Sequence, residues 1–493
     1  MRDRGAEAVG LITLKHSFTS EDQTWFAART GDWNPLHMDP VAARRTLFGG
    51  PVVHGMHVLC WAVNIVLAGV KVGRRLVRLR ASFEHPLPVG FPAQIRFESE
   101  GDDRIQIYVK AAHPVARIEI DLGVAGREIG DLDGTLFSPA VPKDRNFANC
   151  VKATGEIPVP PVAADFSQRY GSLVDALGVR ETAALLATTR LVGMECPGLH
   201  SIFGGLELTF GAAEVEPELI YRVERADPRF SLLTMSVMAM TMRGKIKAFL
   251  RPSPVAQPSF KEICNAVAQN EFAGITALVI GGSRGLGEVV AKCLAAGGAA
   301  VTITYCRGEA DAAAVVGDIS AHGGQARHTR LDIDTASEDI AASLAGAALA
   351  APNAVFYFAA PKIDLGRGVA FDPELFTASA RSFVTAPCVL AQAIAPLCAD
   401  GALHFYPSTT FLDAPISNGL EYSAAKAAGE FAWQSLGSIF EGQRFVAPRL
   451  PRMQTDQTAS LRPEVIDEPL PILLAVLRAC MPPTGRTKDA AHG

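Results

Sequence analysis

The stretch ALVIGGSRGLG, residues 277–287, is apolar for four residues and then becomes rich in glycine. Apolar sequence of this kind, followed by helical sequence over 288–295, is typical of a buried strand, a tight turn and a helix. Glycines let the backbone approach a pyrophosphate, which the positive end of the helix then attracts. A further strand follows at 300–304, so we expect β-α-β alternation and a doubly wound parallel sheet from residue 275 onwards.

The end of the second expected strand indicates which dinucleotide this turn would bind. It reads TYCRG over 304–308 and has no acidic residue to hold a ribose 2′-hydroxyl. Arg284 and Arg307 instead offer guanidinium groups suited to a 2′-phosphate. The sequence therefore predicts NADP(H) as the cofactor.

A tyrosine and a lysine farther along the chain have the spacing of an acid/base pair. Tyr422 and Lys426 in YSAAK (422–426) lie four residues apart, which places them on one face of a helix. We expect the lysine cation to lower the pKa of the phenol, so that Tyr422 can transfer a proton near neutral pH. Ser408, in the preceding FYPSTT (405–410), can donate a hydrogen bond to a substrate oxygen.

Together these features resemble the short-chain dehydrogenase/reductase family over residues 275 to about 480. The resemblance implies a Rossmann-type fold and hydride transfer between the nicotinamide and a carbonyl carbon. It implies that Tyr422 donates the proton, Lys426 holds the ribose and Ser408 the substrate oxygen, while Asp332 contacts the adenine. The cofactor-binding set it implies is Gly281, Ser283, Arg284, Gly285, Gly287, Arg307, Asp332, Ile333, Ala359, Tyr422, Lys426 and Thr455.

Three positions depart from the pattern of that family. Its Asn-Ala-Gly reads Ala359-Ala360-Pro361 here, its usual catalytic Asn corresponds to Phe383, and its Pro-Gly reads Pro451-Arg452. These departures concern the proton relay and the nicotinamide loop rather than the cofactor fold. They motivate an alternative in which the C-terminal domain binds NADP(H) without turnover.

A second motif lies near the N-terminus, in FAARTGDWNPLHMDPVAA (26–43). Gly31, Asn34 and Pro35 are turn-forming residues, so Asp32 and His37 flank a tight loop. Such a loop can bring a carboxylate and an imidazole onto one water molecule, or it can simply shape a turn. In the first case one group moves a proton at Cα while the other handles the hydroxyl at Cβ.

This motif resembles that of the hydratase 2, or MaoC-like, family of (R)-specific enoyl-thioester hydratases. The downstream FGGPVVHGM (48–56) also fits, and the similarity covers about the first 125 residues. It implies an α+β hot-dog fold with Asp32 and His37 as the acid/base pair. It also implies that the Gly55 N–H, at the start of the next helix, stabilises the enolate oxygen.

These features divide the chain into five segments. Residues 1–140 are expected to form the hot-dog dehydratase/hydratase, 141–164 a linker, 165–252 a second and non-catalytic hot dog, 253–272 a linker, and 273–493 the Rossmann domain. The second hot dog lacks a D-x-N-P-x-H loop, although its turn CPGLHSIFGG (196–205) contains His200 and Ser201. Those two residues either touch the substrate or belong to a structural loop.

Composition excludes several classes of protein. The net charge of −5 gives no reason to expect nucleic acid as a partner, and nine cysteines without a CxxC pair indicate neither zinc nor a disulfide framework. No metal is expected. The apolar segment 51–70 contains His54, His57 and Asn64, so we interpret it as a buried helix rather than a membrane span. We expect a cytoplasmic protein that forms a homo-oligomer such as a dimer.

The combined prediction is a bifunctional enzyme of acyl-CoA or acyl-carrier-protein thioesters. It would reduce a 3-oxoacyl group with NADPH and dehydrate the (R)-3-hydroxyacyl product; the alternative direction is oxidative, as in β-oxidation. Five cations in KVGRRLVRLR (71–80) would meet coenzyme A phosphates, the acidic face of a carrier protein, or only solvent along a strand.

Overall fold

The structure is a computed structural model that describes residues 8–10, 14–71, 73–124, 135–211, 217–333, 337–346, 351–363, 365, 370–461 and 464–481. The chain forms two compact units. Unit 1 comprises Met1–Ser253 with Ser460–Glu464, and unit 2 comprises Pro254–Ala459 with Val465–Gly493.

The first half of unit 1 is a helix followed by four antiparallel strands. Helix α4 (Gly55–Leu67) is apolar on most sides and almost wholly buried, which confirms the buried helix expected within 51–70. Strands β3 (Arg74–Phe83), β4 (Pro92–Glu100), β5 (Arg104–Lys110) and β6 (Pro114–Val124) follow it. Buried and exposed residues alternate along β5 and β6, as expected of strands that cover a core on one face only.

The second half of unit 1 repeats this order of elements. Helix α8 (Val179–Arg190) is followed by β8 (Ser201–Thr209), β9 (Leu219–Asp227), β10 (Leu232–Ala239) and β11 (Met242–Leu250). The sheet order is β4-β5-β6-β3 in one half and β8-β11-β10-β9 in the other. The two halves therefore arrange their strands in the same spatial order. The assignment of the second half as a hot dog stays a prediction.

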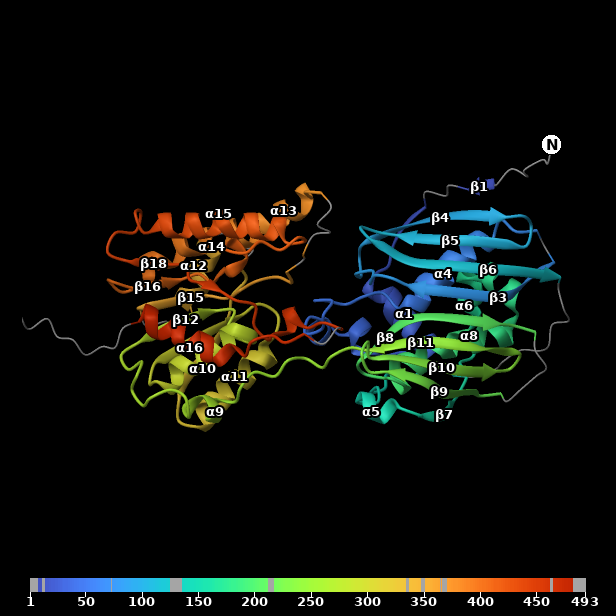
Figure 1. Ribbon diagram of the computed structural model, residues 1–493, viewed down its shortest axis with the longest axis horizontal. Helices are drawn as coiled ribbons and strands as arrows, with labels where there is room; N and C mark the ends of the chain where they lie inside the picture. Colours follow the sequence, from blue (N-terminus) through green and yellow to red (C-terminus); the bar gives the residue numbers. More distant parts are fainter. Residues whose placement is uncertain are drawn as a thin grey trace, which may run out of the picture. The chain divides into compact units, whose positions relative to one another are not determined.

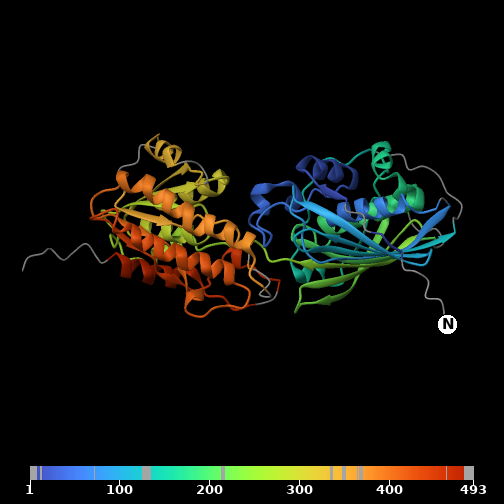
Figure 2. The same ribbon diagram turned by 90° about the horizontal axis from the view of Figure 1, so that it is seen from above.

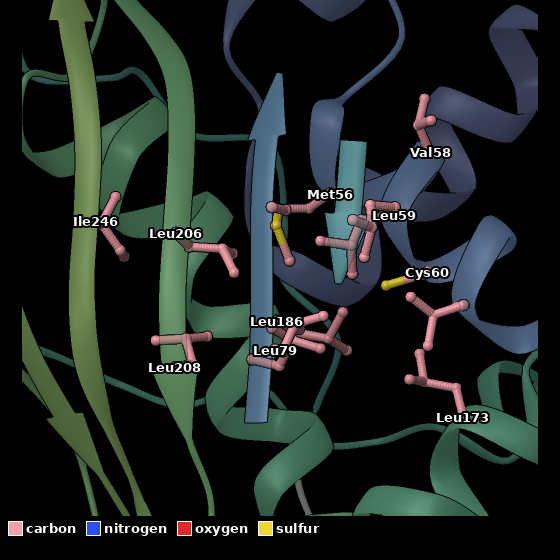
Figure 3. Packing of buried hydrophobic residues seen from close by; sticks show 14 of the residues in the cluster. Met56, Val58, Leu59, Cys60, Leu79, Leu173, Leu186, Leu206, Leu208 and Ile246 are labelled. Atoms are coloured by element: carbon pink, nitrogen blue, oxygen red, sulfur yellow. The ribbon is translucent and has the colours of Figure 1, made fainter. Parts of the chain in front are cut away.

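Strands β3 and β8 join the two halves into one continuous sheet. They pair antiparallel, with Leu79 opposite Leu208 and Ala81 opposite Leu206. Figure 1 shows these strands side by side, and Figure 2 shows the helices of unit 1 gathered on one face of the sheet. In Figure 3 side chains of α4, β3, α8, β8 and β11 lie together in a single core, with labels on Met56, Leu59, Leu79, Leu186, Leu208 and Ile246.

Both expected linkers contain regular structure. Within 141–164 the structure has α5 (Phe147–Cys150) and β7 (Thr154–Ile157), which pairs with β9 at the edge of the sheet. Within 253–272 it has α9 (Phe260–Cys264), which buries Phe260 and Ile263 in the core of unit 2. These elements of four or five residues are too short to show a period in sequence.

Unit 2 contains a six-stranded parallel sheet. Its strands are β12 (Thr276–Ile280), β13 (Ala300–Tyr305), β14 (Gln325–Arg330), β15 (Ala354–Tyr357), β16 (Leu403–Phe405) and β18 (Arg444–Val446). They lie in the order β14-β13-β12-β15-β16-β18, with helices such as α10 (Gly285–Ala296) and α11 (Glu309–Ala321) between them. The order reverses at β12, so the sheet is doubly wound and confirms the prediction.

One helical run in unit 2, Pro373–Leu397, is long and apolar enough to cross a membrane by length and composition. It is made of α13 (Pro373–Ala380), the π-helical turn η2 (Arg381–Thr385), α14 (Ala386–Ile394) and η3 (Ala395–Leu397). Leu390 and Ile394 of this run are buried in a core that also contains Val355 of β15. A core helix of a parallel sheet has the same composition, so length and apolarity do not distinguish the two cases.

Candidate active sites

The loop of unit 1 that is predicted to be catalytic is a tight turn between two helices. Helix α1 (Ser20–Thr30) ends at Gly31, whose φ of 75° lies in the left-handed region that favours glycine. Asn34 then caps α2 (Pro35–Met38) by accepting a hydrogen bond from the Leu36 N–H at 3.0 Å. Residues 31–34 alone connect α1 to α2, so Asp32 and His37 lie around a tight loop, as the turn-forming residues predicted.

Three titratable groups meet at this loop, two from the loop region and one from the start of α4. Asp32, His37 and His54 each have a carboxylate oxygen or ring nitrogen within 4.8 Å of the others. Asp32 is 2% exposed and His37 is half-buried. Nδ1 of His37 donates to the Val52 carbonyl oxygen at 2.7 Å, so in the neutral ring Nε2 is the basic nitrogen.

His54 holds the loop in place rather than facing a ligand. Its Nδ1 lies 2.9 Å from Oε1 of Gln23, and its Nε2 lies 3.0 Å from the carbonyl oxygen of Asp32. The ring also stacks on His37 with centroids 3.9 Å apart. Because both nitrogens already have partners, His54 is poorly placed to complete a metal site with Asp32 and His37.

Burial shifts the pKa values of the acid/base pair towards each other. It raises the pKa of Asp32, against the opposing effects of His37 and of a hydrogen bond from Thr189. It lowers the pKa of His37, which the charge of Asp32 partly offsets. A carboxyl group and an imidazole shifted in these directions are suited to exchanging protons near neutral pH.

The second half of unit 1 supplies part of this site. The hydroxyl of Thr189, at the end of α8, donates to Oδ2 of Asp32 at 2.6 Å. The next turn is the π-helical η1 (Leu191–Glu195), and a Cβ on its Gly193 would lie only 2.1 Å from Oδ1 of Asp32. The Gly193 carbonyl also accepts from Nδ2 of Asn34 at 2.7 Å. These contacts span more than 150 residues of sequence, and no local pattern marks them.

The backbone at the start of α4 lies beside the same group of residues. Gly55 is the first residue of this helix and directly follows His54. The first N–H groups of a helix have no partner within it, so they can stabilise an oxyanion. A Cβ on Gly55 would meet the Phe83 ring at 3.2 Å, which explains why glycine suits this close approach. That Gly55 binds the enolate oxygen remains a prediction.

His200 and Ser201 lie in a structural network. Nδ1 of His200 accepts from Nη1 of Arg251 at 3.3 Å, and Nε2 lies 3.2 Å from the Ser253 hydroxyl. Ser201 begins β8, and its N–H donates to the Gly198 carbonyl at 2.9 Å. Burial and the nearby Arg251 lower the pKa of His200. Of the two alternatives for this turn, the structural one fits these contacts better.

The cations of 71–80 form ion pairs along the sheet. Arg78 pairs with Glu207 at 2.7 Å, and Arg80 pairs with both Glu119 and Glu207. Arg74 pairs with Asp103. Carboxylates of neighbouring strands and of the turn between β4 and β5 therefore pair with Arg74, Arg78 and Arg80, which favours a strand face over a binding surface for coenzyme A or a carrier protein.

In unit 2 the glycine-rich turn brings backbone groups to the carboxyl ends of the strands. Gly281 has a φ of 78°, and a Cβ there would lie 2.6 Å from the Ala359 N atom after β15. A Cβ on Gly287 would lie 2.4 Å from the Gly281 carbonyl oxygen, and one on Gly285 would lie 3.7 Å from Thr455. Side chains at Gly281 and Gly287 would clash with backbone atoms, so glycine allows the strand, the turn and α10 to pack this closely. A tight strand-to-helix turn of this kind suits a pyrophosphate, because the helix N-terminus then faces the ligand.

Several other residues of the predicted cofactor-binding set lie at the same edge of the sheet. Arg307 is exposed two residues beyond β13, and Nη1 of Arg284 lies 3.5 Å from a carboxylate oxygen of Asp456. Ser283 is buried within the glycine-rich turn. Asp332 and Ile333 are half-buried and directly follow β14. All of these positions belong to the carboxyl ends of parallel strands, where such sheets bind ligands.

The predicted effect of Lys426 on Tyr422 is wrong in this structure. Both residues lie on α15 (Leu420–Leu436) and are buried, and burial raises the pKa of Tyr422 to about 12. Burial also lowers the pKa of Lys426 to about 7. Nζ of Lys426 donates to the Pro407 carbonyl at 2.6 Å and to the Tyr406 hydroxyl at 3.3 Å, so its charge is directed away from Tyr422.

Ser408, predicted to hold the substrate oxygen, has a hydrogen-bond partner within the protein. Its hydroxyl donates to Glu430, whose carboxylate also accepts from Arg449. The neighbouring Thr409 instead hydrogen-bonds the Tyr422 hydroxyl and thereby lowers its pKa against the effect of burial. Successive residues of an extended segment point in opposite directions, so Ser408 and Thr409 face different neighbours. The role of Ser408 towards a substrate oxygen stays a prediction.

Phe383 lies within η2 and packs edge-on against Tyr422, with ring centroids 5.3 Å apart. Its carbonyl oxygen accepts a hydrogen bond from Tyr406 at 2.9 Å. Nζ of Lys426 lies 4.8 Å from the centre of the Phe383 ring. The chain thus places an aromatic ring and the hydroxyl of Tyr406 beside the lysine where the resembled family has an asparagine.

Comparison with known proteins finds a family match in the N-terminal part of the chain. Residues 10–117 match the family described as MaoC like domain. The (R)-specific enoyl-CoA hydratase of Aeromonas caviae is 34% identical over 87 residues, 18% of this chain and 64% of that protein. The mitochondrial 3-hydroxyacyl-acyl-carrier-protein dehydratase of Arabidopsis thaliana is 38% identical over 15% of this chain and 43% of that protein. The chain thus spans between two fifths and two thirds of the length of these relatives.

Solved structures similar to the chain include ketoreductases and dehydrogenases. The angucycline C-6 ketoreductase LanV with bound NADP is 20% identical over 44% of this chain and 92% of that chain, with a TM-score of 0.40. A short chain dehydrogenase from Burkholderia cenocepacia in complex with NADP is 24% identical over 43% of this chain and 92% of that chain, with a TM-score of 0.39.

Proposed function

We propose that unit 1 interconverts a 2-enoyl thioester and an (R)-3-hydroxyacyl thioester. The observation that carries this proposal is the meeting of Asp32 and His37 at the start of α4, with their reactive atoms within 4.8 Å. Nδ1 of the half-buried His37 is bonded to Val52, which leaves Nε2 for the substrate. The Thr189 hydroxyl donates a hydrogen bond to Asp32. The names of the two similar hydratase and dehydratase relatives support a thioester substrate.

In the hydration direction, the pair positions one water molecule against Cβ of the enoyl group. One of the two groups takes a proton from this water as it attacks, and the other delivers a proton to Cα. The negative charge that develops on the thioester oxygen is stabilised by N–H groups at the start of α4, with Gly55 first among them. Dehydration follows the same steps in reverse.

For unit 2 we propose reduction of a 3-oxoacyl thioester with NADPH. The glycine-rich turn fits a dinucleotide because Gly281 and Gly287 allow close packing of β12 and α10, which directs the N-terminus of α10 towards the pyrophosphate. Arg307, exposed beyond β13, would hold the 2′-phosphate, and the bound cofactor would supply the hydride. Tyr422 donates the proton to the carbonyl oxygen, and Thr409 orients the Tyr422 hydroxyl.

The two proposed reactions share one intermediate, the 3-hydroxyacyl thioester. Joining both sites in one chain raises the effective concentration of this intermediate at the second site. A preference for NADPH favours the reductive, dehydrating direction of lipid or polyketide-like biosynthesis. The oxidative direction remains the second candidate, because the same groups catalyse both directions.

A pair of variants tests whether the two activities are separate. Asp32→Asn should reduce hydration of a 2-enoyl thioester by about two to four orders of magnitude, because it removes one proton-transfer group. The same variant should still oxidise NADPH with a 3-oxoacyl thioester at nearly the rate of the wild type. Tyr422→Phe should show the opposite pattern, and product analysis by mass spectrometry distinguishes the two.

Two outcomes would contradict this proposal. A folded Asp32→Asn protein that lost both activities would contradict the assignment of separate sites. A wild-type reductase that produced only the (3S)-hydroxyacyl isomer would contradict the shared intermediate, because the hydratase assignment requires the (3R) isomer.

A further inference from the structure

Arg251 is a buried cation without an anionic partner. It directly follows β11 and is 5% exposed. Its Nη2 donates to the Leu199 carbonyl at 2.9 Å, and its Nη1 donates to Nδ1 of His200 at 3.3 Å. Its Nε is buried and has no hydrogen-bond partner. All its partners are therefore neutral.

This arginine differs from the paired arginines of the same unit. Arg78 and Arg80 each have carboxylates within 4.0 Å, whereas among the described residues no carboxylate lies within that distance of Arg251. Burial alone lowers its pKa, to about 10, so the side chain is still charged at neutral pH. A buried charge without a counter-ion is costly, which indicates that an anion binds here in the functional state.

A cavity of about 330 Å³ lies at this position, lined by Arg251, His200, Ser253, Asn146 and eight other residues. Asp144, the carboxylate on its rim, is 72% exposed and lies 3.4 Å from Nε2 of His200. His200 keeps its proton on Nε2, because Nδ1 accepts from Arg251. The imidazole therefore orients the guanidinium without neutralising it.

The cavity lies beside the catalytic loop. The Leu199 carbonyl oxygen accepts from Nη2 of Arg251 and is also 3.4 Å from Nδ2 of Asn34. Asn34 in turn lies between Asp32 and His37 in the loop. One carbonyl group thus separates the unpaired cation from the loop that bears the proposed acid/base pair.

We propose that this cavity binds an oxyanion of the thioester substrate, with Arg251 as its counter-ion and Ser253 as a second donor. Two parts of a thioester carry such a group: a phosphate of the coenzyme A or phosphopantetheine handle, and a carboxylate at the far end of the acyl chain. Both match a guanidinium in charge and geometry. The proposal rests on the hydratase function of unit 1 and adds the site that recognises its substrate.

Hydration kinetics of the full chain with three substrates test this site. The substrates are a 2-enoyl-CoA, the N-acetylcysteamine thioester of the same acyl group, which has no phosphate, and that thioester with a terminal carboxylate. Arg251→Met should raise KM at least tenfold wherever the bound oxyanion is present. A rise confined to the coenzyme A thioester assigns the phosphate, and a rise confined to the carboxylated thioester assigns the carboxylate. Arg78→Met is the matched control, and it should leave all three KM values unchanged.

Three outcomes would overturn the proposal. One is an unchanged KM for all three substrates in folded Arg251→Met, and another is an equal loss with the neutral N-acetylcysteamine thioester. Should Arg251→Met fail to fold, Ser253→Ala replaces it, with an expected rise in KM of about threefold; an unchanged KM would then count against the site. A wild-type protein that hydrates none of the thioesters would contradict the hydratase function itself, which is a separate result.

Discussion

Asp32 is a carboxylate whose protonation is set by residues from two distant parts of the chain. Burial disfavours its charged form, while the Thr189 hydroxyl and the loop N–H of Asn34 favour it. Because these influences oppose each other, the removal of one should shift the pH at which the carboxylate ionises.

Thr189→Val removes the hydroxyl and keeps the shape of the side chain. Its hydrogen bond favours the ionised carboxylate, so its loss should raise the pKa of Asp32 further. The acid limb of kcat/KM for hydration should then move to higher pH, with a loss of about tenfold at neutral pH. Thr189→Ser keeps the hydroxyl and should retain the profile of the wild type. A Val variant with an unchanged pH profile would show that Thr189 does not act on Asp32.

The two adjacent hydroxyls near Tyr422 allow a direct comparison. Thr409→Val removes the group that hydrogen-bonds Tyr422, so ketone reduction should fall by about tenfold or more in kcat. Ser408→Ala removes a donor to Glu430, so it should mainly lower thermal stability. NADPH oxidation and thermal unfolding measured on both variants distinguish these effects. If Ser408→Ala lost more activity than Thr409→Val at equal folding, the assignment of Thr409 would be wrong.

Residues that are close in sequence could be predicted to lie together. Asp32 and His37 are five residues apart around one loop, and Tyr422 and Lys426 are on one helix, so their spacing predicted their proximity. Thr189 was missed because 157 residues separate it from its partner. The pKa of Tyr422 was predicted in the wrong direction because burial depends on packing that spacing does not show.

Among the elements, the π-helical turn η1 closes the proposed hydratase site. Gly193→Ala would place a methyl group 2.1 Å from Oδ1 of Asp32, a separation that the buried carboxylate cannot accept without moving. We expect at least a hundredfold loss in hydration and a lower melting temperature. Gly171→Ala, in α7 (Gly171–Leu177) of the same half, meets nothing within 4 Å and should be close to neutral. Equal activity of the two variants would mean that η1 is not part of the site.

Helices and strands with a clear apolar pattern could be predicted from the sequence, whereas very short helices and strands could not. Strands β12 and β13 and helix α4 have clear apolar patterns, which is why their positions could be expected. Strand β7 and helix α9 lay within segments assigned as linkers. They are stabilised by pairing and burial rather than by their own composition, so only the folded chain shows them.

At the scale of the whole molecule, we expect NADPH to bind to unit 2 and not to unit 1. NADPH at a hundred times its dissociation constant should stabilise the unit that binds it by about 2.7 kcal/mol. Hydrogen exchange measured by mass spectrometry should therefore slow in peptides of 276–305 and 354–359, around the glycine-rich turn. Peptides of α4 and β3 in unit 1 should exchange at the same rate with and without NADPH. Slower exchange in unit 1 alone would place the cofactor elsewhere.

The pairing of β3 with β8 within one chain affects how unit 1 can evolve by substitution. In an assembly of two identical chains, every substitution appears twice, so a residue that improves one site also alters its counterpart. Here both paired strands belong to one polypeptide, so a substitution in one half leaves the sequence of the other half unchanged. The end of α8 and the following turn η1 can therefore place Thr189 and Gly193 against a single carboxylate. The end of α4 does not have to carry the same residues. Mutation can specialise one half as the reaction centre and the other as its support.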